Sequence, residues 1–208
     1  MSETAVIAMK RNIVLAAHQA GEGHVASAFS ILDILWVLYD QVLRADNPAD
    51  QISGDRFVLS KGHASLALYA VLAAKGKLPA DAMENFCAYY ALLGGHPDSV
   101  KVPHIEASTG SLGHGLPIAT GMALGAKIRG HANQIFCLVG DGECNEGSVW
   151  ESALLASHHQ LSQLTCIVDY NHSTDRALHM GDLVAKFKAF GWDAESIDGH
   201  NHDQIKVF

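Results

Sequence analysis

Oxygen ligands and glycines follow two apolar segments in the second half of the chain. Asp141 stands between two glycines directly after the apolar run 135–139, and Asn171 follows the apolar run 165–168. In open parallel sheets, ligands bind beyond the carboxyl ends of strands, and a carboxylate with an amide oxygen is typical of Mg²⁺ sites. Glycine also lets a diphosphate approach the backbone closely. The spacing predicts a metal–diphosphate site if the two runs are neighbouring strands, although Gly-Asp-Gly is also common in ordinary turns.

The elements that must position these residues alternate between strands and helices. Apolar runs predict strands over 56–59, 135–139, 165–168 and 192–197. Helical spacing and end signals predict helices over 4–20, from Ser30 to Asn47-Pro48, over 64–74, from Pro79 through Tyr90, over 148–160 and over 182–190. Strands separated by single helices pair in parallel. We expect an α/β fold with a doubly wound, mostly parallel sheet and helices on both faces.

One domain is expected to occupy residues 1–208, because neither an internal repeat nor a low-complexity linker interrupts the chain. A helix cap at 201–203 is followed by only five residues. A helix thus begins where the sequence ends, and we expect the domain to be truncated at its C-terminus.

Composition and charge exclude several classes of partner. The 208 residues carry a net charge of −8 and no run of lysine or arginine, so we expect neither nucleic acid nor an anionic membrane as partner. The longest apolar stretches are interrupted, and the N-terminus lacks a secretory signal pattern. The four cysteines include no Cys-x-x-Cys pair, which favours free thiols and a cytoplasmic location.

Thirteen histidines are candidate acid–base groups, because the unperturbed imidazole pKa is about 6.5. His63 and His96 each follow a glycine, and His96 lies in the non-periodic stretch 94–115, a texture typical of functional loops. His200 and His202 lack a third ligand at zinc-like spacing and are weak metal candidates. Six others are expected on the surface: His18, His131, His158, His159, His172 and His179.

Several motifs occur together in the order of one family. The segment 140–151 (GDGECNEGSVWE), with Asn171 thirty positions after Asp141, resembles the thiamine diphosphate signature in its transketolase form. Further matching segments are 23–24 (GH), 55–63 (DRFVLSKGH), 95–97 (GHP), 109–115 (TGSLGHG), 190–192 (FGW) and 198–200 (DGH). The chain most resembles transketolase family members whose N-terminal half is a separate subunit, which implies a thiamine-diphosphate-binding fold.

The resemblance implies a cofactor and a metal. The side chains of Asp141 and Asn171 and the backbone carbonyl of Ser173 would bind Mg²⁺, or Ca²⁺ or Mn²⁺ in its place. Gly142 would contact the diphosphate of thiamine diphosphate. The remaining cofactor contacts would be His63, at the diphosphate, and Gly110 and Leu112, beside the aminopyrimidine.

The resemblance also implies an activity, the transfer of a two-carbon ketol unit between sugars or sugar phosphates. His24 and His96 would face the thiazolium C2 and the sugar carbonyl, and His63 would join them as a catalytic residue. Glu146 and Glu151 would belong to a carboxylate network at the subunit boundary. The pyrimidine-binding half of the family is absent, so we expect activity only with a C-terminal transketolase subunit, in a heterotetramer or dimer of heterodimers.

The chain departs from the family pattern at a few positions. Ser173 and Asp175 stand where apolar residues are usual, His114 replaces a glutamine, and Val25-Ala26 replaces Pro-Gly. Two alternatives to the transketolase interpretation remain open, and Asp175 favours the second. One is a condensing enzyme similar to 1-deoxyxylulose-5-phosphate synthase, and the other is a non-catalytic paralogue that binds or assembles with a partner.

Overall fold

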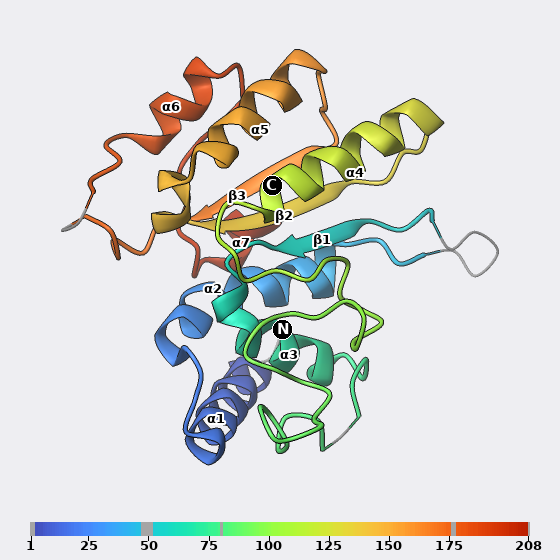
Figure 1. Ribbon diagram of the computed structural model, residues 1–208, viewed down its shortest axis with the longest axis vertical. Coiled ribbons are helices and arrows are strands. Elements are labelled where there is room, and N and C mark those ends of the chain that lie inside the picture. The colour runs from blue at the N-terminus through green and yellow to red at the C-terminus, as the bar shows by residue number, and fades with distance from the viewer. Residues whose placement is uncertain (1–2, 47–51, 80, 176–177, 208) are drawn as a thin grey trace. The chain divides into compact units, whose positions relative to one another are not determined.

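The computed structural model describes residues 3–46, 52–79, 81–175 and 178–207. The chain divides into two units, which Figure 1 shows with their elements labelled. The helical unit comprises the described residues of 1–42, 62–110 and 198–208, and the sheet unit comprises those of 43–61 and 111–197. Buried apolar side chains form a core in each unit.

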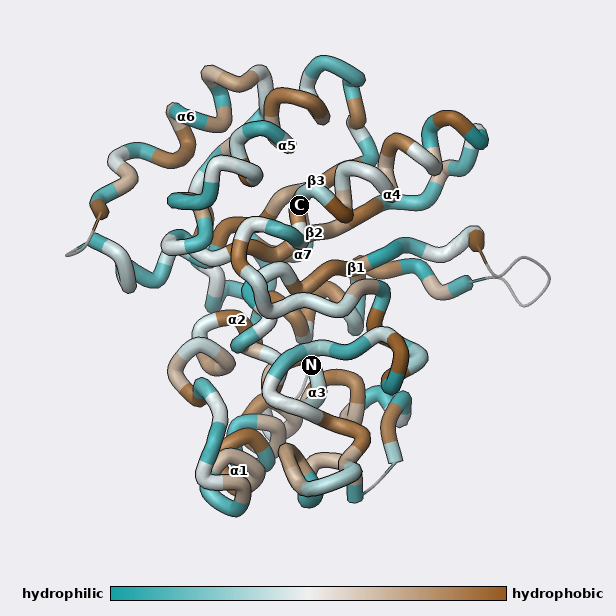
Figure 2. Tube along the Cα trace, in the orientation of Figure 1, coloured by the Kyte–Doolittle hydropathy of each residue, from teal (hydrophilic) through white to brown (hydrophobic). Residues whose placement is uncertain are grey.

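Three parallel strands form the sheet, in the order β1 (Arg56–Leu59), β2 (Ile135–Gly140) and β3 (Leu164–Asp169). All six residues of β2 are buried, and Figure 2 shows the hydrophobic colour along this strand. A central strand buried on both faces is a continuous apolar run, which is why the sequence revealed it. The predicted α/β fold with a parallel sheet is confirmed.

Helices connect and cover these strands within the sheet unit. α4 (Gly115–Arg129) packs against β2 and against α5 (Gly147–His158), which joins β2 to β3. α6 (Leu183–Ala189) begins where the Asp182 carboxylate accepts a hydrogen bond from the Ala185 N–H at 2.9 Å. Its Phe187 ring lies 5.1 Å from the Trp150 ring of α5, so aromatic packing places α6 beside α5.

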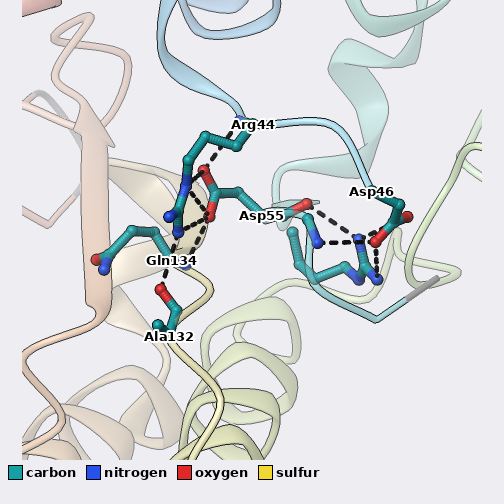
Figure 3. A network of polar contacts seen from close by, with 7 residues as sticks. Arg44, Asp46, Asp55, Ala132 and Gln134 are labelled. Atoms are coloured by element: carbon teal, nitrogen blue, oxygen red, sulfur yellow. Dashed lines mark hydrogen bonds and ion pairs between the residues drawn. The ribbon is translucent and has the colours of Figure 1, made fainter. Parts of the chain in front are cut away.

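A buried carboxylate ties the amino ends of β1 and β2 together (Figure 3). Asp55 accepts hydrogen bonds from Arg44 Nη2 and from the Gln134 N–H, both at 2.7 Å, and Arg44 Nη2 also donates to the Ala132 carbonyl. Burial raises the pKa of Asp55, but the hydrogen bonds and charge of Arg44 outweigh it and lower the pKa. This network stabilises the end of the sheet opposite the carboxyl ends of the strands.

In the helical unit, α1 (Glu3–Ala20), α3 (Ser65–Ala74) and α7 (His202–Lys206) all contact α2 (Val25–Val37). A π-helical turn, Leu38–Val42, continues α2. Contrary to the sequence-based expectation, the stretch Val25–Val42 is long and apolar enough to cross a membrane by length and composition. Half of it is buried inside the structure, as in a core helix, so this is weak support for a membrane span.

Most predicted elements are confirmed to within two residues: the strands 56–59, 135–139 and 165–168, and the helices 4–20, 64–74, 148–160 and 182–190. The helix expected to begin at Ser30 starts earlier, at Val25, because the buried apolar face already includes Ala28. Its predicted end at Asn47-Pro48 lies outside the described residues. The predicted cap at 201–203 is also confirmed, since Asn201 Oδ1 accepts from the Asp203 N–H at 3.1 Å.

Two predicted elements are wrong. After Pro79 the chain forms successive turns instead of a helix: Phe86 N–H bonds to Met83, and Cys87 N–H bonds to Leu93 at 2.8 Å. The segment 192–197 has no strand partner among the described residues. Trp192 instead donates its indole N–H to the Ala153 carbonyl at 2.9 Å and so contacts helix α5.

Candidate functional site

Asp141 lies directly after β2 and caps a short 3₁₀ turn, Gly142–Asn145. The residue is 1% exposed. Its Oδ1 accepts hydrogen bonds from the Gly142 N–H at 2.8 Å and from Ser173 Oγ at 2.9 Å. Its Oδ2 is buried and accepts no hydrogen bond from the described residues. Buried carboxylate oxygens normally have a partner, and a divalent cation would supply one here.

The turn after β3 brings two more predicted metal ligands to Asp141. His172 has a φ of 62°, in the left-handed region, so the chain turns sharply between Asn171 and Ser173. Asn171 Oδ1 accepts from the Ser173 N–H at 3.0 Å, while Ser173 Oγ reaches Asp141. The structure therefore brings Asp141, Asn171 and Ser173 together at the carboxyl ends of β2 and β3.

Gly142 is closely packed against the same turn. A Cβ atom at this position would lie 2.5 Å from Thr174 Cγ2, far inside van der Waals contact. Only glycine fits here without displacing Thr174. The oxygens of Asp141, Asn171 and Ser173 are hard ligands of the kind that Mg²⁺ prefers. The orphaned Oδ2 and this donor set fit a divalent cation.

The carboxylate of Asp175 is engaged in hydrogen bonds with residues of its own turn. Its carboxylate accepts hydrogen bonds from Tyr170 Oη at 3.1 Å and from His172 Nδ1 at 2.8 Å. The hydrogen bond from His172 lowers the pKa of Asp175, although partial desolvation acts in the opposite direction. Asp175, which stands where the family usually has an apolar residue, is thus held within the turn 170–175.

Glu143 is a buried residue that the sequence analysis missed. It is 1% exposed, and its Oε1 accepts hydrogen bonds from Ser60 Oγ and from the Gly113 N–H at 2.8 Å. Its Oε2 accepts from the Gly140 N–H at 3.1 Å. One carboxylate thus connects the end of β1, the end of β2 and the segment before α4. The sequence signal that could have indicated Glu143 was its position inside the motif 140–151, close to the predicted metal ligand Asp141.

The predicted carboxylates of the subunit boundary lie at the N-terminal end of α5. Glu146 immediately precedes the helix and Glu151 lies in its second turn, and both are exposed. Gly113 packs against the Glu146 side chain, and its carbonyl accepts from Ser148 Oγ at 2.7 Å. Leu112, next to Gly113, is half-buried. The start of α5 therefore holds the segment that carries one predicted cofactor contact.

Predicted histidines gather within the helical unit. The rings of His24 and His63 lie 5.2 Å apart in an edge-to-face arrangement. A Cβ at Gly110, whose φ is 149°, would lie 2.8 Å from Cδ2 of His96, so Gly110 packs directly against that ring. Gly62, which precedes His63, packs against the backbone of Thr109 and Gly110. His24, His63 and His96 are thus brought together with Gly110.

The loop that carries His96 is fixed by a buried tyrosine. Tyr69 Oη donates to the His96 carbonyl at 2.8 Å, and Ser65 Oγ donates to the Gly95 carbonyl at 2.9 Å. Burial raises the pKa of Tyr69, so its hydroxyl remains a hydrogen-bond donor. His24 and His96 are exposed and His63 is half-buried, so all three are accessible for a ligand in this unit. The six histidines expected on the surface are exposed or half-buried.

Comparison with known proteins identifies the family of this chain and its fold. The model of the transketolase thiamine diphosphate binding domain matches residues 2–207. The transketolase of Campylobacter jejuni superposes with a TM-score of 0.87 at 30% identity, covering 100% of this chain and 35% of that chain.

Three curated relatives match most of the chain but only part of their own length. A Rhodococcoides fascians protein named ferredoxin fas2 is 43% identical over 88% of this chain and 61% of its own. The 6-deoxy-6-sulfo-D-fructose transketolase subunit from a Clostridium species is 40% identical, over 89% and 70%. An apulose-4-phosphate transketolase subunit from Phocaeicola vulgatus is 34% identical, over 94% and 72%. Since the family model spans residues 2–207, the chain belongs to the transketolase thiamine diphosphate-binding domain family.

Proposed function

We propose that this chain is the diphosphate-binding part of a thiamine-diphosphate- and Mg²⁺-dependent transketolase. Such an enzyme transfers a two-carbon ketol unit between sugars or sugar phosphates. The observation that carries the proposal is the buried Oδ2 of Asp141, which accepts no hydrogen bond within the described part of the chain and belongs to the same cluster as Asn171 and Ser173. A cation at this position would neutralise a diphosphate that the anionic chain alone would repel.

Each proposed ligand has a defined part in holding this cation. Asp141 and Asn171 would bind it through side-chain oxygens, and Ser173 through its backbone carbonyl. Mn²⁺ or Ca²⁺ would occupy the same oxygen site. Gly142 would bring its backbone close to the diphosphate, because no side chain intervenes.

The histidines of the helical unit would serve the sugar substrate. Thiamine diphosphate, when bound, supplies the electron sink for the carbon–carbon bond chemistry. His24, His63 and His96 would hold and move protons at the sugar hydroxyls and carbonyl, for which an imidazole is suited near neutral pH. Gly110 would leave room for the His96 ring against the backbone, since a Cβ there would lie 2.8 Å from Cδ2 of that ring. Gly110 and Leu112 are each proposed as contacts of the aminopyrimidine.

A partner chain would complete the active site. Two relatives are named as transketolase subunits, which supports a two-chain enzyme with a pyrimidine-domain partner. In the sheet unit, α4 and α5 border an open cavity of about 580 Å³, lined in part by Pro117, Leu124, Glu151 and Leu155. Leu155 is 45% exposed, so this surface offers apolar area to a partner. We propose that the assembly is a heterotetramer or dimer of heterodimers in the cytoplasm.

Turnover measurements with and without the partner test this function. Ketol transfer to an aldose acceptor would be measured for this chain alone, the partner alone and the assembled enzyme, each with thiamine diphosphate and Mg²⁺. Activity is expected only in the assembly, and EDTA should abolish it. Turnover by the purified chain alone would contradict the need for a partner. An assembly that binds the cofactor but transfers no ketol unit from any donor would support a non-catalytic binding protein.

A further inference from the structure

We propose that Asp169 orients the side chain of the metal ligand Asn171 and anchors the backbone of the metal ligand Asp141, with Lys61 as its buried counter-charge. This inference rests on the proposed function, since it concerns the same cation site. Asp169 is the last residue of β3 and pairs in register with Gly140, the last residue of β2. It therefore lies between the two segments that supply Asp141 and Asn171.

Asp169 contacts each of these residues through a different group. Its backbone carbonyl accepts a hydrogen bond from the Asp141 N–H at 3.1 Å. Its side-chain Oδ2 accepts a hydrogen bond from Asn171 Nδ2 at 3.0 Å. One residue thus fixes the backbone of the first ligand and the side chain of the second.

The charge of Asp169 decides which way the Asn171 amide faces. An ionised carboxylate only accepts hydrogen bonds, whereas an amide has a donor end and an acceptor end. The Asp169 carboxylate can therefore bond only to Nδ2, and this leaves Oδ1 directed to the side of Ser173, where it accepts at 3.0 Å. A neutral amide at position 169 adds a donor group and loses the charge, so it would weaken this selection, and a leucine there would accept no hydrogen bond from Asn171 and would abolish it.

Lys61 allows this charge to exist in the interior. Its side chain is 1% exposed, that of Asp169 is 7% exposed, and Nζ of Lys61 forms an ion pair with Oδ2 of Asp169. A buried charge without a partner is strongly unfavourable. Lys61 follows β1 by two residues, so the carboxyl ends of all three strands are connected through Asp169.

Mutation of a purely structural ion pair and mutation of a residue that orients a metal ligand change different measured quantities. Partners that orient a metal ligand typically change metal affinity about 10- to 100-fold when they are mutated. A structural pair instead changes thermal stability, and replacement of both charges by apolar residues of similar volume often restores it. Metal affinity and thermal stability must therefore be measured on the same variants.

Electron paramagnetic resonance titration of Mn²⁺ into the assembled enzyme with thiamine diphosphate makes this measurement. Asp169→Asn should weaken Mn²⁺ binding about tenfold or more. The double variant Lys61→Met/Asp169→Leu should recover thermal stability but keep the weak Mn²⁺ binding. Asp55→Asn is the matched control, because it weakens the ion pair between the buried Asp55 and the exposed Arg44 at the opposite end of the sheet and should leave Mn²⁺ affinity unchanged.

The outcomes separate this inference from the proposed function. Asp141→Ala should abolish Mn²⁺ binding, and wild-type affinity in that variant would overturn the cation site itself. If Asp141→Ala loses Mn²⁺ but a folded Asp169→Asn or double variant binds Mn²⁺ as tightly as the wild type, then Asp169 is only structural. A loss of Mn²⁺ affinity in Asp55→Asn equal to that in Asp169→Asn would also overturn the positioning role.

Discussion

The Nε2 atom of His202 lies 2.8 Å from Oδ1 of Asp33, which joins the first turn of α7 to the middle of α2. His200 makes a second contact, with its Nδ1 3.0 Å from Oδ2 of the same carboxylate. The two histidines that were weak metal candidates therefore share one aspartate. Asp33 is 8% exposed, so the two histidines supply hydrogen-bond partners to a buried carboxylate in a mainly apolar helix.

This contact predicts acid-sensitive stability in the helical unit. Burial raises the pKa of Asp33, but hydrogen bonds from His202 and His200 and the charge of Lys10 outweigh it, so the pKa is lowered from 3.8. A carboxylate whose pKa is lowered on folding stabilises the fold above its unfolded pKa. That contribution is lost as the pH falls through the folded pKa, below about pH 4.

Thermal unfolding between pH 7 and pH 3 would show this effect. Asp33→Asn should unfold at a lower temperature than the wild type near neutral pH, and the difference should shrink as the pH falls below 4. Hydrogen exchange of α7 amides should rise in the same variant. Asp203→Asn, a change of an exposed carboxylate on α7, is the control. A difference that stays constant across the whole pH range would contradict the ionised role of Asp33.

Gly142→Ala should weaken cofactor binding. The new Cβ would overlap Thr174 Cγ2, and overpacking of this kind costs about 1–3 kcal/mol. It would also stand between the backbone and a diphosphate, so thiamine diphosphate affinity should fall about tenfold or more, which corresponds to 1.4 kcal/mol. In Gly142→Ala/Thr174→Ser the overlapping methyl group is removed, so thermal stability should recover while affinity stays low. Full recovery of affinity would show that Gly142 has only a packing role.

Two sets of histidines provide a matched test of the proposed catalytic roles: His24, His63 and His96 in one set, and His158 and His159 in the other. The rings of His24 and His63 are 5.2 Å apart in the helical unit, and those of His158 and His159 are 5.0 Å apart at the end of α5. In the assembled enzyme, alanine at His63 or His96 should lower kcat/KM about 100-fold or more, as expected for a lost proton-transfer group. Alanine at His158 or His159 should change it less than about threefold. Similar losses in both sets, with assembly intact, would refute the assignment.

Sequence patterns predicted the sheet well because its strands are short apolar runs, of which the central strand β2 is buried throughout. The apolar run before Asp141 predicted β2, and the strand ends predicted where Asp141 and Asn171 would meet. Both predictions depend on local residue types and on a general rule for parallel sheets. Neither requires knowledge of contacts between distant residues.

Long-range contacts explain what the sequence did not reveal. α4 was missed because Pro117, Gly121 and Gly125 interrupt its pattern, and its buried face consists mainly of small residues such as Ala119 and Ala123. The partners of Glu143, at Ser60 and Gly113, lie 83 and 30 residues away in sequence. Nothing in the local sequence indicates such partners.

The helix predicted after Pro79 is wrong because the backbone conformation and the burial of its residues do not follow a helical pattern. Cys87 and Tyr90 have φ values of 57° and 62°, in the left-handed region, which excludes a continuous right-handed helix through them. Phe86 is buried, whereas Tyr89 is 88% exposed, so the aromatic spacing that predicted a helix does not share one buried face.

Calorimetric titration of thiamine diphosphate into the assembled enzyme, with Mg²⁺ and then with EDTA, tests the central claim most directly. Asp141 and the diphosphate are both anionic, so tight binding of thiamine diphosphate should require Mg²⁺ in the wild type. Asp141→Ala should lose most of the Mg²⁺-dependent affinity, while Asp175→Ala, whose carboxylate is held by Tyr170 and His172, should keep most of it. Equal affinity of the wild type and Asp141→Ala for thiamine diphosphate in the presence of Mg²⁺ would contradict the account.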